Sequence, residues 1–403
     1  AMNSREIKKS DFTRYTIYSL WDTYRNVHPM LALLYPKQQL DMVRSIVGMY
    51  QDGGWLPKWE QVGRETYNMN GDPSVPVIVD SYLKGMKDFN VNAAYEGMII
   101  QATNIEKGNK LRPGLYQYLK YGYIPNDDKG IYFVPGPAST TMEYAFADWT
   151  IARMAESLGK HEDAKEFYRR AGFYKNVFDP SSGYFRGRLK NGEFHLPFDT
   201  LVWEESYEEG NAWHYNFMVP HDQQGLMQLM GGEKKYTERL QRLFDGGHYM
   251  MGNEPDIAYP YLFNYVKNEE WRSQKTVRAI LRQNYSNSLS GMIGDDDCGT
   301  MSAWAICAMI GLYPVCPASN HYAITSPVFK KITIKTDAQF YSGRDFVIEA
   351  PNSSETNIYI GSMTRNGTKT DSYFLDHSDL VKGGTLGMKL SIQPGKNKDG
   401  TVN

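Results

Sequence analysis

The amino-acid sequence predicts a mainly α protein in which paired helices close into an (α/α)6 toroid, followed by a small antiparallel β domain. Between residues 16 and 312, apolar side chains recur at helical spacing in segments of roughly ten to eighteen residues, with little strand-like alternation. These segments number about ten to twelve, which fits a ring of helix pairs. After Pro317 the chain changes to short, β-branched, alternating segments.

Two domains follow from this change of pattern. Residues 1–317 are expected to form the helical barrel and residues 318–403 the small β domain. A chain of 403 residues is longer than one ordinary core fills, which also favours a large and a small domain. An open α-solenoid would show the same helical periodicity, so the closed ring rests on the helix count.

The expected helices are recognised from apolar spacing and from their ends. Ser139 is expected to cap a long helix over residues 140–158, with Glu143 near the capping-box position. The other expected helices cover residues 36–50, 74–89, 91–102, 161–177, 222–230, 233–245, 257–267, 270–283 and 299–311.

The β domain is expected from period-two segments separated by turn residues. Residues 331–335, 346–350 and 357–360 are β-branched and alternate between apolar and polar side chains. Asn366-Gly367 and Gly383-Gly384 supply turns between such segments. The three segments therefore predict a small antiparallel sheet.

Composition excludes several classes of function. Lys and Arg total 44 against 46 Asp and Glu, and no basic stripe is present, so a nucleic-acid-binding surface is not expected. No spanning helix or signal peptide is recognisable. The three cysteines cannot all pair within one chain, which argues against a disulfide framework. The many aromatic residues fit a large core or a cleft that stacks on sugar rings.

Three consecutive carboxylates, Asp295, Asp296 and Asp297, lie between glycines directly before an apolar helix. Like charges and flanking glycines favour a loop, and the following helix would place this loop at its N-terminal end. Metal binding, activation of water and simple capping of the helix all fit the local pattern.

Other polar loops occur at helix junctions of the same domain. The loop 52–60 carries two indoles beside Lys58 and Glu60, and further loops contain Glu209 and Asn253-Glu254. In a closed toroid the loops at one end converge, so distant residues can share a cleft. A pair of carboxyls can then cleave a glycosidic bond, and further carboxylate and amide oxygens suit a hard cation such as Ca²⁺. His214 and His221 lack metal-ligand spacing and are expected to be hydrogen-bonded structural residues.

Six motifs in one order resemble the calcium-dependent exo-α-mannosidases of glycoside hydrolase family 92, over residues 12 to 390. The resemblance implies an (α/α)6 catalytic barrel, an N-terminal β-sandwich domain that this sequence lacks, and further β-structure. The motifs are Ser19 to Arg25, Gly54 to Glu60, Glu209 to Trp213, Val219 to Asp222, Gly252 to Pro255, and Gly294 to Trp304 followed by Tyr313 to Pro317.

The resemblance also implies roles for individual residues. Glu209 matches the general acid, and Asp295 and Asp297 match the acidic pair assigned to base work in an inverting single displacement. Family Ca²⁺ contacts sugar hydroxyls, and Asn253, Glu254 and Asp295 are the candidate ligands. The candidate sugar-binding residues are Trp21, Asp22, Lys58, Trp59, Glu60 and Trp213.

The function implied is removal of terminal α-linked mannose from glycans, in a bacterial periplasmic or secreted protein. Three alternatives remain: another toroidal sugar enzyme such as an epimerase, a glycan-binding fragment that lacks part of its site, and a helical scaffold. Because the family's active site lies at the interface with the absent β-sandwich domain, the glycan-binding alternative follows directly from the length of the sequence.

Overall fold

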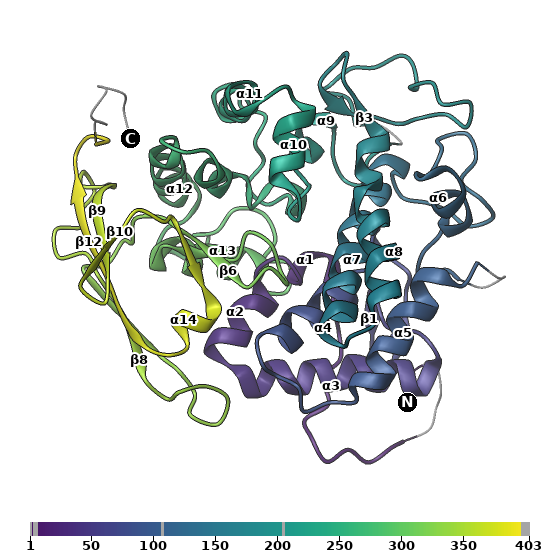
Figure 1. Ribbon diagram of the computed structural model, residues 1–403, viewed down its shortest axis with the longest axis horizontal. Coiled ribbons are helices and arrows are strands. Elements are labelled where there is room, and N and C mark those ends of the chain that lie inside the picture. The colour runs from purple at the N-terminus through teal and green to yellow at the C-terminus, as the bar shows by residue number, and fades with distance from the viewer. Residues whose placement is uncertain (1, 3–6, 106–108, 204–205, 396–403) are drawn as a thin grey trace.

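The computed structural model describes residues 2, 7–105, 109–203 and 206–395 and is mainly helical, with its largest sheet at the C-terminal side (Figure 1). The helices are α1 Leu20–Thr23, α2 Val27–Leu34, α3 Pro36–Gly53, α4 Ser74–Leu83, α5 Val91–Thr103, α6 Leu115–Tyr121, α7 Pro137–Ser157, α8 His161–Ala171, α9 Ala212–Tyr215, α10 Gln223–Leu229, α11 Glu233–Asp245, α12 Glu270–Asn284, α13 Thr300–Ile310 and α14 His377–Leu380, with 3₁₀ helices η1 Gly172–Val177, η2 Glu254–Asp256 and η3 Tyr259–Tyr265.

The strands are short before residue 312 and longer after it. They are β1 Glu60–Gln61, β2 Arg64–Glu65, β3 Phe178–Asp179, β4 Tyr184–Phe185, β5 Leu312–Tyr313, β6 His321–Ile324, β7 Lys331–Lys335, β8 Asp345–Glu349, β9 Tyr359–Arg365, β10 Thr368–Thr370, β11 Phe374–Asp376 and β12 Gly384–Ser391. The predicted order of a helical region followed by β-structure is therefore confirmed.

The helical region closes on itself. Consecutive helices pack as neighbours, as in α7 with α8, α10 with α11 and α12 with α13. The last of these, α13, also packs against α2, and Asn26 Nδ2 donates a hydrogen bond of 3.1 Å to the carbonyl oxygen of Thr300. An open solenoid would keep its first and last helices apart. Contact between them shows that the described helices form a closed arrangement.

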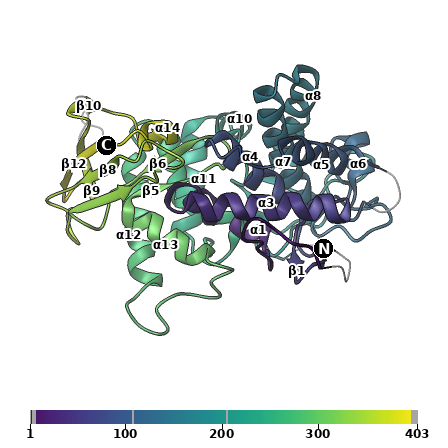
Figure 2. The same ribbon diagram turned by 90° about the horizontal axis from the view of Figure 1, so that it is seen from below.

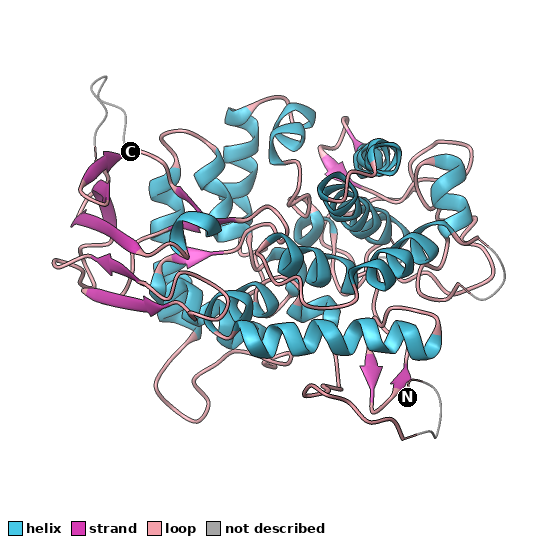
Figure 3. Cartoon of the chain, turned by 60° about the horizontal axis from the view of Figure 1, so that its bottom comes forward, coloured by secondary structure: helices cyan, strands magenta, loops and turns pink. Residues whose placement is uncertain are grey.

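Closure gathers several loops on one side of the molecule. Figure 2 shows α1, strand β1 and the long connection between α12 and α13 on the same side of α3. The long helix α3 lies across the molecule in Figure 3 and is bounded by Pro36 in its first turn and by Gly54, whose positive φ of 81° ends the helix. This scaffold places the polar loops expected from the sequence near one another.

The C-terminal sheet differs from the purely antiparallel prediction. Its strand order is β10-β9-β12-β8-β7, and β12 pairs with β8 in parallel. The chain leaves this sheet after β10, adds β11 to β6 of another sheet and forms α14 before it returns as β12. Such a crossover lets β12 enter in the same direction as β8, which a hairpin cannot do. The sheet's core includes Leu33 and Leu312, so it packs directly against the helical region. The division at residue 317 stays a prediction.

Two details of the expected helices are also wrong. Helix α7 begins at Pro137, so Ser139 lies inside its first turn, and the buried Glu143 pairs with Arg25 at 2.9 Å in place of a capping box. The segment expected as a helix over 257–267 forms the 3₁₀ helix η3, which has Pro260 at its start. No helix within the described parts of the chain combines the length and apolar character needed to cross a membrane.

Candidate active site

The loop that carries Glu209 is held in an uncommon backbone conformation. Glu209 has a φ of +44°, in the left-handed region that non-glycine residues seldom occupy. Hydrogen bonds hold the backbone of the preceding residue: Ser139 Oγ accepts from the Glu208 amide at 2.9 Å, and Tyr215 Oη donates to the Glu208 carbonyl at 2.5 Å. Asn253 Nδ2 donates to the Glu209 carbonyl at 3.0 Å. The surrounding fold therefore supports a strained backbone at this carboxylic acid.

The local structure explains why the sequence Gly-Asn-Ala-Trp follows Glu209. Asn211 is the N-cap of α9, and its side-chain oxygen accepts from the amides of Trp213 at 2.9 Å and His214 at 3.3 Å. A Cβ at Gly210 would approach the Tyr215 ring to 2.9 Å, so only glycine fits this turn. The short helix α9 thus begins immediately beside Glu209.

The three aspartates before α13 divide between capping and exposure to the site. Asp296 Oδ1 accepts from the Ser302 amide at 2.9 Å, and its carbonyl accepts from Met301 at 3.2 Å, so Asp296 satisfies the start of the helix. Asp297 has a φ of +46° and is half-buried, whereas Asp295 is exposed. Capping of the helix is therefore confirmed for Asp296, and roles for Asp295 and Asp297 in metal binding or activation of water stay predictions.

Four carboxyls from four separate segments lie close enough to perturb one another: Asp22, Glu209, Glu254 and Asp297, here called the carboxyl cluster. Burial, then the charges of Asp297 and Glu209, raise the pKa of Asp22 to about 7. Burial, then Asp22 and Asp297, raise the pKa of Glu254 to about 9. The pKa of Glu209 is raised by burial and by Asp297. Desolvation and like charge both disfavour ionisation of these carboxyls.

Asp297 interacts electrostatically with each of the other three carboxyls of the cluster. Its pKa is raised by burial, an effect that a hydrogen bond with Glu254 opposes and that the charges of Asp295 and Asp296 reinforce. Asp295 acts on the cluster through the effect of its charge on Asp297. The structure therefore brings Glu209 and Asp297 into one site, with Asp295 at its exposed rim.

A buried arginine lies behind the cluster and was missed in the sequence. Arg25 pairs with Glu143 at 2.9 Å, stacks over the Trp21 ring at 4.9 Å, and lowers the pKa of Asp22 and Glu254 by its charge. Its place in the Trp-Asp-Thr-Tyr-Arg motif was the available signal. Arg25 is thus a buried cation whose charge favours the ionised forms of Asp22 and Glu254 and opposes the effect of burial on them.

The donor chemistry of the cluster fits a hard divalent cation. Asp22 Oδ2 and Glu254 Oε1 are buried and have no hydrogen-bond partner, and carboxylate oxygens are the ligands that Ca²⁺ prefers. Asn253, also expected as a ligand, has its amide nitrogen engaged by Glu209 and by His214 Nδ1 at 3.2 Å. As they stand, the described residues include no three Asp, Glu, His or Cys side chains arranged to hold a metal ion.

The residues expected to bind sugar occupy varied environments. Lys58 is buried and faces Glu208, and burial lowers the pKa of Lys58 to about 8. Glu60 lies apart from the cluster, because its carboxylate accepts from Thr16 Oγ1 at 2.7 Å and from the amide of Ile17 at 2.9 Å. These two contacts fasten the N-terminal segment to strand β1. Glu60 therefore has a structural role that the neighbouring residues in the sequence did not predict.

The three expected indoles also differ. Trp21 is fully buried, and Trp213 is 8% exposed and stacks on His248 with ring centroids 4.4 Å apart. Neither ring offers a free face to a sugar. Trp59 is half-buried, and its amide donates to Glu65 Oε1 at 3.0 Å.

A second carboxyl beside the expected acid was not singled out in the sequence. Burial, then the charge of Glu209, raise the pKa of Glu208 to about 7, while Lys58 opposes the shift. A larger share of Glu208 is therefore protonated near neutral pH than of an ordinary glutamate. The pKa of each of the two adjacent glutamates, Glu208 and Glu209, is raised, so electrostatics alone does not decide which of them donates the proton.

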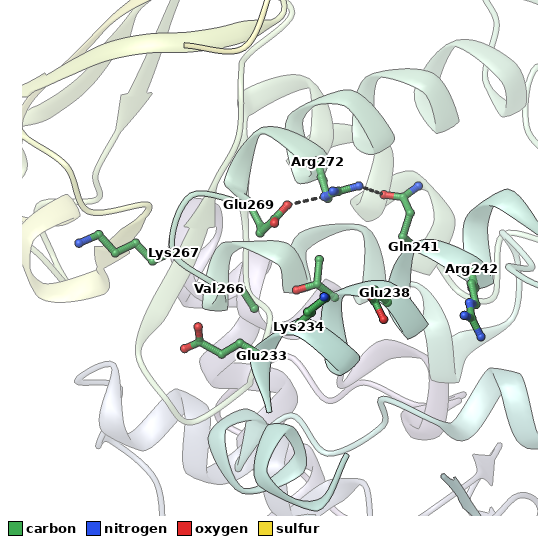
Figure 4. A pocket seen from close by; sticks show the side chains of 10 residues that line it. Glu233, Lys234, Glu238, Gln241, Arg242, Val266, Lys267, Glu269 and Arg272 are labelled. Atoms are coloured by element: carbon green, nitrogen blue, oxygen red, sulfur yellow. Dashed lines mark hydrogen bonds and ion pairs between the residues drawn. The ribbon is translucent and has the colours of Figure 1, made fainter. Parts of the chain in front are cut away.

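Cavities also occur elsewhere on the helical region. One of about 510 Å³ lies between α11 and the start of α12 (Figure 4). Arg272 spans it, donating to Glu269 at 2.5 Å and to Gln241 Oε1 at 2.7 Å. A cavity of about 830 Å³ reaches Gly252 and Gly294, next to two loops of the carboxyl cluster.

Carboxyls of raised and differing proton affinity, brought together from separate loops, form a candidate acid–base site: cleavage of a glycosidic bond needs one carboxyl that protonates the leaving oxygen and another that deprotonates water. The chain belongs to glycoside hydrolase family 92: residues 2–392 match the family's catalytic domain. The resemblance expected from the motifs is therefore confirmed.

Proteins of known structure and a further sequence relative are similar to this chain over most of its length. A family GH92 inverting mannosidase from Bacteroides thetaiotaomicron is 32% identical, with a TM-score of 0.89 over 98% of this chain and 55% of its own. A GH92 α-mannosidase from the same organism is 35% identical, with a TM-score of 0.89 over 98% of this chain and 53% of its own. An uncharacterized secreted glycosidase from Arthroderma benhamiae is 28% identical over 87% of this chain and 49% of its own. The chain thus spans about half the length of these relatives.

Proposed function

We propose that this chain is the (α/α)6 catalytic barrel of an exo-acting α-mannosidase, which removes terminal α-linked mannose from glycans with inversion. The observation that carries the proposal is the convergence of Glu209 and Asp297 within one carboxyl cluster. Family membership and mannosidase relatives at 32% and 35% identity support the choice of sugar. The relative described as secreted supports a periplasmic or secreted location.

Glu209 serves as the general acid in this proposal. Its raised pKa keeps a proton available, and the pinned backbone aims the carboxyl at the leaving oxygen. Asp297, with Asp295 at the rim, serves as the general base that deprotonates water on the opposite face of the sugar. Asp22 and Lys58 bind the sugar's hydroxyls beside them. An inverting reaction needs this division between one protonated and one ionised carboxyl.

Ca²⁺ is the proposed cofactor, held by Glu254 and Asp22, with Asn253 and Asp295 as further candidate ligands. A bound divalent cation supplies positive charge that holds sugar hydroxyl oxygens and balances the charge of the carboxylates. The buried oxygens without hydrogen-bond partners on Asp22 and Glu254 support this assignment.

The function is tested by incubating the chain with α-1,2-, α-1,3-, α-1,4- and α-1,6-mannobiose, with Ca²⁺ and then with EDTA. We expect mannose release from at least one disaccharide and loss of activity with chelator, and from α-mannosyl fluoride, whose only sugar product is one mannose, we expect β-mannose as the first anomer seen by proton NMR. Release of α-mannose first from the fluoride contradicts inversion, and a changed disaccharide without release of mannose favours an epimerase. Mannose binding by calorimetry without turnover favours a glycan-binding fragment, an alternative supported by the half-length match to the relatives.

Glu254→Gln is expected to weaken Ca²⁺ binding by about tenfold to a hundredfold, because it removes a charged oxygen donor from the site. Calorimetric titration with Ca²⁺ measures this without any sugar. Glu166→Gln, on the exposed surface of α8, is the matched control and should bind Ca²⁺ as the unmodified chain does. Equal affinity in all three proteins would remove Glu254 from the cation site.

A further inference from the structure

The loop before the Glu209 segment exposes a large indole. Trp203 is 56% exposed, and Leu201 and Val202 beside it are 54% and 51% exposed. Large apolar side chains grouped on a surface are a common sign of a binding site. In contrast, Trp21 and Trp213 are buried against their neighbours. Of these three indoles, the side chain of Trp203 is thus the most accessible to solvent.

Contacts tie Trp203 to the backbone of the proposed acid. Its ring meets the His214 ring edge to face, with centroids 5.7 Å apart and an interplanar angle of 65°. His214 Nδ1 lies 3.2 Å from Asn253 Nδ2, which donates to the Glu209 carbonyl at 3.0 Å. Two side chains therefore separate the exposed indole from Glu209.

The loop itself is anchored at the same point. Asn211 Nδ2 donates to the Leu201 carbonyl at 3.5 Å, and the same side chain caps α9. The exposed side of Trp203 therefore lies at the edge of the segment that carries Glu209.

We propose that Trp203 is a platform for the sugar ring on the leaving-group side of the scissile bond. This inference rests on the proposed mannosidase function and adds to it the recognition of the second sugar. The general acid protonates the leaving oxygen, so the ring attached to that oxygen must lie on the Glu209 side of the site. A pyranose presents an apolar C–H face, and an indole offers a broad apolar surface to pack against it. Trp203 thereby favours a glycan chain over a simple leaving group.

The test compares two substrates in Trp203→Ala. For the mannobiose that the unmodified chain cleaves best, kcat/KM should fall by about tenfold or more through a higher KM, since a truncated aromatic anchor costs at least this much. For α-mannosyl fluoride, which has no second ring, kcat/KM should be unchanged. Trp203→Phe should restore most of the mannobiose activity, and Leu196→Ala, at an exposed position of the same loop, should behave as the unmodified chain on both substrates.

Each of the other possible outcomes would contradict one part of the proposal. Unchanged kinetics on both substrates would remove Trp203 from sugar binding, and an equal loss on both would show that it acts through His214 on the acid. Inactivity of the unmodified chain toward both substrates would instead contradict the proposed function. Calorimetry then tests the platform by itself: Trp203→Ala should weaken the binding of mannobiose and leave that of mannose unchanged, and an equal effect on both sugars would refute it.

Discussion

Glu209→Gln is expected to lower kcat for an α-mannobiose by about 10²–10⁴-fold, the usual contribution of a general acid. Gln keeps the shape of the side chain and cannot donate the proton that the leaving oxygen needs. The loss should nearly vanish for a dinitrophenyl α-mannoside, whose leaving group departs without protonation. Steady-state kinetics on the two substrates measure this difference.

Glu208→Gln is the matched control, because Glu208 is the adjacent carboxyl and its pKa is raised to about 7. If Glu209 is the acid, this variant keeps the leaving-group dependence of the unmodified chain. The pH profile gives a second readout. A raised acid pKa places the basic limb of kcat/KM above the usual range for a carboxyl, and Glu209→Gln should abolish that limb. Loss of the limb in Glu208→Gln alone would transfer the role to Glu208.

Asp148→Asn is expected to destabilise the fold by about 3–5 kcal/mol, because it removes the carboxylate that pairs with the buried Arg170 and leaves the buried Arg112 with Asp72 as its counter-ion. Asp148 accepts from Arg112 Nη1 and from Arg170 Nε, both at 2.7 Å, and from Tyr118 Oη at 3.0 Å. Its side chain has no exposure to solvent. Helix α7, which carries Asp148, also carries the Ser139 that holds the Glu208 amide.

Urea denaturation followed by circular dichroism measures this loss of stability. Glu166→Gln serves as the control, since the Glu166–Arg169 pair of α8 has about half of each side chain exposed. A surface pair of this kind contributes roughly 0–1 kcal/mol. Similar unfolding midpoints for Asp148→Asn and Glu166→Gln would show that the buried network does not hold α6, α7 and α8 together.

Local patterns identified much of the fold. Apolar spacing predicted α3 and α5, and period-two alternation predicted β7, because these repeats reflect which face of an element is buried. The same patterns misplaced the start of α7 and the role of Glu143. The capping-box spacing is a local signal, while the partner that Glu143 takes, Arg25, lies 118 residues away in the chain.

The sequence by itself determined the family, the helical class and the loops that carry acids, because motif order and residue periodicity are properties of the chain alone. Only the tertiary structure decided which acids share a site: closure of α13 onto α2 brings the loop of Asp297 to Asp22, Glu254 and Glu209. It also separated Asp296, which caps a helix, from its two neighbours, and it exposed Trp203 while burying Trp21. Charge interaction and burial depend on distance in space, and residues far apart in sequence acquire that distance only when the ring closes.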